Sequence, residues 1–190
     1  MGSQSTRYSK IAMGFHWLSA IVVLAAFATG MGGPVERVYS ETRLFDRQLH
    51  ETLGLAVFLL TLLRVLWKLL DRRPEPVEMP SWMERSAHIM QRVLYLLLIF
   101  VPVTAVLGAA LTGHQLDFLG GASWAPIVSP MPSLGGIITE IHPLLGDAIV
   151  WLAGAHAAAG LFHHYILRDG VLSSMLPDAV LLKLPRLGRE

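Results

Sequence analysis

The sequence contains no cysteine among its 190 residues. This absence excludes disulfides, iron–sulfur clusters, thiolate metal ligands and covalent cofactor attachment through a C-x-x-C-H motif. Charge is also scarce, because only 15% of the residues are charged, against about 25% in soluble domains. A net charge of +1 gives no support for a nucleic-acid partner. Eight histidines, eight methionines and the carboxylates remain for binding a metal or cofactor.

Long apolar segments make up most of the chain, which is 53% hydrophobic with a mean hydropathy of +0.52. Four segments are long enough to cross a bilayer. They are residues 11–35, 48–70, 93–116 and 140–168. A cleaved signal peptide is the alternative for the first, but its apolar run is too long and carries His16. The sequence therefore predicts an all-α integral membrane four-helix bundle, with a Pro-rich linker at 71–84 and a loop at 117–140 that folds back over the bundle.

Basic residues are concentrated on one side of the expected bundle. Eleven of the fifteen flank the N-terminus, the second connection and the tail: Arg7, Lys10, Lys68, Arg72, Arg73, Arg85, Arg92, Arg168, Lys183, Arg186 and Arg189. The positive-inside rule places that side, and with it both termini, in the cytoplasm.

The fourth predicted span carries His142, His156, His163 and His164. Titratable groups at membrane depth are costly and usually functional. The first three are separated by multiples of seven residues, so they share one helical face. His142 and His156 lie about 21 Å apart along the axis, at about 1.5 Å per residue. This ladder predicts two binding sites stacked across the membrane.

Depth suggests the partners of these histidines. His50 begins the second span on the same side as His142, so the two are expected to face each other. His16 lies in the opposite half of the first span. Its partner stays open between His156 and His163, and position alone favours His163.

A small residue stands one helical turn after each of four histidines. The pairs are His16–Ala20, His50–Gly54, His142–Gly146 and His156–Gly160. Glycine is costly inside a helix, so we interpret these residues as room for a flat macrocycle, with helix packing as the alternative. Two histidines facing across a four-helix bundle suit a haem iron, and a centre with imidazole on both axial positions transfers electrons.

Several motifs extend this pattern. They are Tyr8-Ser9 before His16-Trp17, His50 with Gly54, Leu62-Leu63-Arg64, Ala87-His88, Tyr95-Leu96-Leu97, Pro102, and His156-Ala157-Ala158-Ala159 with His163-His164-Tyr165. In these motifs the chain resembles the bacterial cytochrome b561 family, related to the cytochrome b subunits of hydrogenases and formate dehydrogenases. The resemblance covers residues 7–177 as one transmembrane domain and leaves 178–190 as a cytoplasmic tail.

The resemblance implies a multi-pass protein of the bacterial inner membrane with two non-covalent haem b groups. It implies iron ligation by His16 and His156 at the inner haem, and by His50 and His142 at the outer haem. It also implies ubiquinone as a substrate or bound electron partner. We assign His163 and His88 as quinone candidates. Arg64 is a candidate partner for a haem propionate, with snorkelling to the cytoplasm as the alternative.

One branch of the family resembles superoxide:ubiquinone oxidoreductases. Arg37, Arg43 and Arg47 would steer such an anion on the periplasmic side, but three acidic neighbours offset them: Glu36, Glu41 and Asp46. A periplasmic redox protein is the other candidate donor.

Two other functions stay open. One is the haem-bearing anchor of a larger dehydrogenase or hydrogenase. The other is a haem-free proton or metal transporter that uses the histidine ladder. Of the remaining histidines, His164 is expected at the membrane interface. His114 is expected to be exposed and without a partner.

Overall fold

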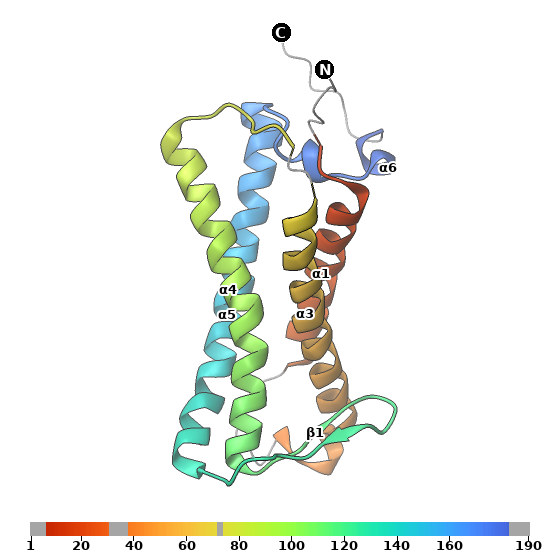
Figure 1. Ribbon diagram of the computed structural model, residues 1–190, viewed down its shortest axis with the longest axis vertical. Coiled ribbons are helices and arrows are strands. Elements are labelled where there is room, and N and C mark those ends of the chain that lie inside the picture. The colour runs from red at the N-terminus through yellow and green to blue at the C-terminus, as the bar shows by residue number, and fades with distance from the viewer. Residues whose placement is uncertain (1–6, 31–37, 72–73, 183–190) are drawn as a thin grey trace.

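The computed structural model describes residues 7–30, 38–71 and 74–182 (Figure 1). Within these ranges four helices are long and apolar enough to cross a membrane, which confirms the predicted all-α membrane bundle. They are α1 (Lys10–Thr29), α3 (Leu44–Leu70), α4 (Ser81–Thr112) and α5 (Pro132–Phe162). The sidedness of the bundle stays a prediction from its basic residues.

Short elements connect and follow these helices. They are a 3-10 turn (Glu41–Arg43), the strands β1 (Leu116–Asp117) and β2 (Ser123–Trp124), a π-helical turn (His163–Leu167), a second 3-10 turn (Ser173–Met175) and α6 (Asp178–Leu181). The two strands pair antiparallel as a small hairpin.

The loop after α4 folds back over the bundle, as the sequence predicted. Glu51 of α3 accepts a hydrogen bond from the Asp117 amide, and the Thr52 hydroxyl lies 3.0 Å from the Leu119 amide. These bonds fasten the β-hairpin to the start of α3 (Figure 1). We call this end of the bundle the hairpin end.

The described beginning and end of the chain meet at the opposite end, which we call the terminal end. The Tyr8 amide donates to the Ser174 carbonyl at 3.1 Å, and the Trp17 indole donates to the Met175 carbonyl at 2.9 Å. Arg7 contacts Asp178, and its charge and hydrogen bond hold the pKa of that carboxyl below its usual value. Four spans bring both ends of the described chain to one side, in agreement with the predicted topology.

Three helices begin at least four residues earlier than their hydropathy indicated. We expected spans from 48, 93 and 140, whereas α3 begins at Leu44, α4 at Ser81 and α5 at Pro132. Pro132 occupies the first turn of α5, where its missing amide proton costs nothing. Apolar runs predict the part of a helix inside the bilayer, while backbone hydrogen bonding continues beyond it.

The first span ends earlier than predicted, because α1 stops at Thr29 and Gly30 caps it with a hydrogen bond to Ala26. Several other predictions fall outside the described residues. They concern residues 31–35 of the first span, the cations Arg37, Arg72, Arg73, Lys183, Arg186 and Arg189, and tail residues 183–190.

The four long helices form two tight pairs. α1 packs mainly on α3, α4 packs mainly on α5, and α1 and α5 contact each other only sparsely. Figure 1 shows α4 and α5 together on one side of the bundle and α1 and α3 on the other. Each histidine pair described below spans the boundary between the two helix pairs.

Glycines allow the close approach of α4 and α5. A Cβ atom on Gly108 would lie 2.7 Å from the Thr139 hydroxyl oxygen. A Cβ atom on Gly135 would lie 2.8 Å from the Leu111 carbonyl carbon, which is backbone and cannot move aside easily. Small residues therefore set the helix separation, as is usual in membranes.

We predict that Gly135→Ala destabilises the bundle by about 1–3 kcal/mol, the usual cost of overpacking. Gly136→Ala is the matched control, because no atom lies within 4 Å of its Cβ position. Unfolding in detergent, followed by circular dichroism, measures the difference. Equal midpoints for the two variants would contradict this account of the α4–α5 contact.

Candidate functional site

His50 of α3 and His142 of α5 face each other toward the hairpin end, as predicted, with ring centroids 6.0 Å apart. The Nδ1 atom of His50 lies 2.8 Å from the Ala26 carbonyl oxygen, and that of His142 lies 2.9 Å from the Val101 carbonyl oxygen. A carbonyl oxygen only accepts, so each Nδ1 carries the ring proton and each Nε2 keeps a free lone pair. Metal-binding histidines usually have this arrangement.

Residues that the sequence analysis missed hold these two rings. A Cβ atom on Gly30 would lie 2.5 Å from Cε1 of His50, so only glycine leaves room for the ring beside Ala26. Thr104 lies 3.3 Å from Nδ1 of His142 and donates to the same Val101 carbonyl at 2.8 Å. The signal for Gly30 was its place at the end of the first apolar run. Backbone carbonyl partners leave no sequence signal.

His16 of α1 and His156 of α5 form the second pair, with ring centroids 6.2 Å apart. The structure therefore brings His156 to His16, the pairing that the family resemblance implied. His163, which depth counting favoured, bonds instead to Asp169.

Both pairs have the separation that a shared metal requires. A metal bonded to one nitrogen of each ring at about 2 Å, the usual imidazole distance, places the ring centroids about 6 Å apart. Among the described residues, no three His, Asp or Glu side chains converge to hold a bare ion. Pairs of imidazoles suit a metal whose other ligands come from a planar macrocycle.

The small residues leave different amounts of space at the two pairs. No atom lies within 4 Å of a Cβ position on Gly54 or Gly146, so the helix surface one turn from His50 and His142 is open. At Gly160 the Leu172 side chain lies 3.6 Å from that position. The space predicted beside the histidines is thus present at the hairpin end, whereas a tail residue partly covers it at the terminal end.

Arg64 distinguishes the terminal-end pair. Its Nη2 atom lies 3.1 Å from Nδ1 of His16, and its guanidinium lies 5.1 Å from the centre of the Tyr95 ring. Arg64 thus lies against the histidine pair, while its predicted pairing with a haem propionate stays a prediction. Because a guanidinium only donates, the His16 Nδ1 accepts here and the ring proton stands on Nε2. Nε2 of His16 can ligate a metal only when Arg64 releases Nδ1.

The two quinone candidates have different surroundings. His163 is buried, at 8% exposed, and its Nδ1 bonds to the Asp169 carboxylate. His88 lies on an exposed part of α4. His164 is half-buried against Tyr165, with ring centroids 4.8 Å apart.

The two described arginines at the start of α3 and just before it, Arg43 and Arg47, lie next to carboxylates. Arg47 lies 2.8 Å from Asp117 and 3.4 Å from Glu51, and Arg43 lies 3.7 Å from Asp46. Arg37, the third cation proposed to steer an anion, lies outside the described residues. Arg43 and Arg47 therefore offer less free positive charge than the sequence suggested.

The prediction that His114 is exposed and unpaired was wrong. Its ring stacks on Tyr39 with centroids 3.7 Å apart, and its Nδ1 lies 2.9 Å from the Thr112 hydroxyl. Burial, and then the Arg47 charge, lower the pKa of His114, which favours the neutral ring. Tyr39 is distant in sequence, so only the folded loop reveals this contact.

Comparisons with known proteins identify the family to which the chain is similar. A family model described as prokaryotic cytochrome b561 matches residues 7–178. The chain is 30% identical over 172 residues to cytochrome b561 homolog 1 of Escherichia coli (strain K12), covering 90% of this chain and 97% of that protein. It is 31% identical over 180 residues to the probable superoxide oxidase CybB of Yersinia pestis, with 90% and 96% covered. It is 32% identical over 180 residues to cytochrome b562 of Cereibacter sphaeroides, with 92% and 98% covered.

We predict that Gly30→Ala pushes the His50 ring away from Ala26 and weakens haem binding at the hairpin end by about tenfold or more, from an overpacking cost of about 1–3 kcal/mol. Gly14→Ala on the same helix is the control, because no atom lies within 4 Å of its Cβ position. Haem titration of the purified protein, read by absorption, measures the effect. Equal affinity in both variants would show that His50 does not need Gly30.

Proposed function

Because the chain belongs to the prokaryotic cytochrome b561 family, membrane cytochromes with b-type haem that transfer electrons, we propose that it holds two haem b groups and passes electrons to quinone across the membrane. The observation that carries this proposal is the pair of facing imidazole pairs, at 6.0 and 6.2 Å, at two levels of one bundle. When bound, each haem supplies a one-electron redox centre.

At the hairpin end, His50 and His142 are the proposed ligands, each through Nε2. The Ala26 and Val101 carbonyls hold the ring protons on Nδ1, so both rings present a lone pair without rearrangement. The open surfaces at Gly54 and Gly146 support a macrocycle beside these ligands. Two imidazole ligands at this site would suit the group to electron transfer rather than to oxygen chemistry.

At the terminal end, His16 and His156 are the proposed ligands. Arg64 must leave Nδ1 of His16 for Nε2 to bind iron. A carboxylate is a stronger partner for a guanidinium than a neutral imidazole. Arg64 would therefore prefer a haem propionate to Nδ1 of His16. Binding of haem and release of His16 from Arg64 would then occur together. Gly160, one turn beyond His156, is the proposed small residue of this site.

The two proposed sites lie about 21 Å apart along α5, counted from His142 to His156. This spacing supports a relay from one membrane surface to the other. The basic residues support a cytoplasmic terminal end in the bacterial inner membrane. The resemblance implies ubiquinone as the membrane-soluble partner, which would then react at the terminal end. His163 is the first candidate to contact the quinone, and His88 is the second.

Superoxide is the proposed electron donor at the hairpin end, on the strength of the Yersinia pestis relative named as a probable superoxide oxidase. The pairing of Arg43 and Arg47 with carboxylates weakens the steering argument. A periplasmic redox protein is the alternative donor. A soluble subunit that copurifies with the chain would favour the alternative of an anchor in a larger dehydrogenase. Membership of a cytochrome family leaves the haem-free transporter hypothesis without support.

We predict two haem b groups per chain, released by acid and acetone because no cysteine can tether them. The pyridine haemochrome assay, normalised to protein, measures the ratio. A reproducible value near one would remove one histidine pair from the proposal.

We also predict that His156→Ala loses the terminal-end haem or converts it to high spin, because the iron loses an axial imidazole. His163→Ala keeps two low-spin haems and slows electron exchange with a soluble quinone. Electron paramagnetic resonance of both variants measures the spin states. A high-spin signal in His163→Ala alone would exchange the two roles.

A further inference from the structure

A buried histidine and an aspartate form a closed pair just beyond α5. His163 and Asp169 are bonded through Nδ1 and a carboxylate oxygen, and their side chains are only 11% and 15% exposed. The second carboxylate oxygen accepts the Val171 amide at 3.1 Å, which fixes the orientation of Asp169. The pair stands two helical turns beyond His156 and takes no part in the iron sites.

The backbone between the two residues is unusual. Residues His163–Leu167 form a π-helical turn, and Arg168 adopts a left-handed conformation with φ of 55°. A left-handed residue commonly ends a helix but is usually glycine, so the non-glycine Arg168 carries a conformational cost of about 1–3 kcal/mol, and π-helical turns are rare. Together they turn the chain back so that Asp169 reaches His163. Such departures from regular backbone concentrate at functional sites.

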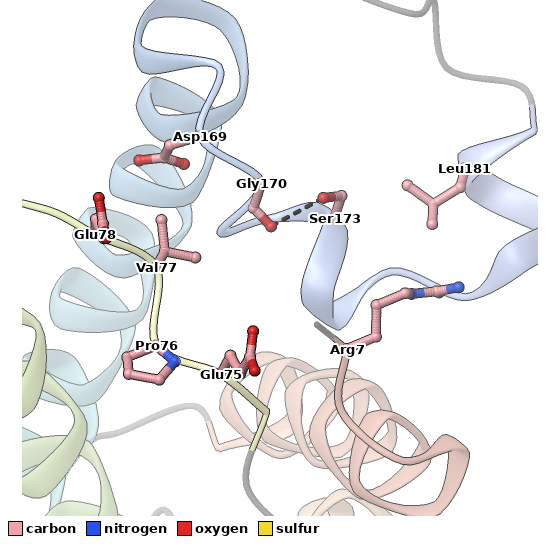
Figure 2. Close-up of a pocket in the computed structure, with 9 residues that line it drawn as sticks. All are labelled: Arg7, Glu75, Pro76, Val77, Glu78, Asp169, Gly170, Ser173 and Leu181. Carbon is pink, nitrogen blue, oxygen red and sulfur yellow. Dashed lines mark hydrogen bonds between the residues drawn. The ribbon is translucent and has the colours of Figure 1, made fainter. Parts of the chain in front are cut away.

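Asp169 connects the pair to a cavity at the terminal end. The cavity has a volume of about 520 Å³ and lies between the N-terminal segment, the linker before α4 and the tail. Figure 2 shows Asp169 on its wall near Glu78, with Glu75 directed into the same space and Arg7 across from it. The cavity is large enough to hold many waters. Water therefore reaches Asp169, whereas His163 lies behind it.

We propose that Asp169 and His163 form a proton relay that carries protons from this cavity to the quinone. The inference rests on the proposed quinone function and names the route of its protons. Asp169 acts as a positioning residue and proton donor for His163. The other charged groups that face the cavity, and so determine its electrostatic potential, are Glu75, Glu78 and Arg7.

The chemistry requires such a route. One quinone takes two electrons, delivered singly from an external one-electron reductant through the proposed haems, and two protons from cavity water, and becomes quinol. In each proton transfer, the N–H bond of His163 that faces the quinone breaks as an O–H bond forms on the quinone, the other ring nitrogen accepts a proton from the protonated Asp169 carboxyl, and Asp169 regains its own proton from cavity water. A ring flip then turns the protonated nitrogen back to the quinone and the bare nitrogen back to Asp169 before the second transfer.

The test separates proton-coupled from proton-free oxidation of the same protein. Dithionite-reduced holoprotein in nanodiscs is mixed in a stopped-flow instrument with ubiquinone-1 or with ferricyanide, and haem absorbance is followed. We expect Asp169→Asn to slow oxidation by ubiquinone-1 by roughly tenfold to a hundredfold, within the range of lost acid–base catalysis. The variant should also change the pH dependence of that rate. Oxidation by ferricyanide, which takes no proton, should not change.

Asp147→Asn is the matched control, because Asp147 is an exposed aspartate on α5. It should leave both rates at their wild-type values, and Asp169→Glu should recover part of the quinone rate. A wild-type quinone rate and pH profile in Asp169→Asn would overturn the relay. So would a wild-type quinone reaction that is equally fast in deuterium oxide, a measurement that does not depend on any variant folding. If ferricyanide oxidises the wild type but ubiquinone-1 does not, the quinone partner itself is wrong, and the relay is rejected with it.

Discussion

A polar nitrogen inside a bilayer has no water to bond, so a histidine at that depth is stabilised by a partner in the protein or in a ligand. At the hairpin end, backbone carbonyls of α1 and α4 accept hydrogen bonds from Nδ1 of His50 and His142. Each ring is thereby oriented by a helix other than its own. The second nitrogen remains free, and the two free nitrogens share one level between the helix pairs. The ligand geometry is thus a consequence of satisfying polar groups in an apolar solvent.

The bundle is built from two tight helix pairs. Gly108 and Gly135 let α4 approach α5 closely, while α1 and α5 contact each other little. Both histidine pairs cross this less occupied boundary. A planar group inserted there would complete the packing between the pairs. Such a group, if it bound the folded state alone, would stabilise that state.

The two ends of the bundle differ in how they treat charge. At the hairpin end, Arg47 is shared between two carboxylates and held beneath the β-hairpin. At the terminal end, Arg64 points at an imidazole rather than a carboxylate, and carboxylates line a cavity next to a buried histidine. At the first end the arginine is neutralised by its neighbours. At the second end Arg64 keeps its charge available for an acidic ligand, which supports the proposed difference between the two sites.

The sequence alone determined the membrane class, the four spans and the two levels of histidine, because hydropathy and helical spacing are local properties of the chain. It also placed His50 opposite His142. It could not choose between His156 and His163 for His16 without a family resemblance, since depth along one helix does not fix which face meets another helix. It missed Gly30, the Ala26 and Val101 carbonyls and the Tyr39–His114 stack, and it extended α1 too far. These features depend on contacts between residues distant in the chain, or on backbone atoms that every residue shares. Only the tertiary structure decides them.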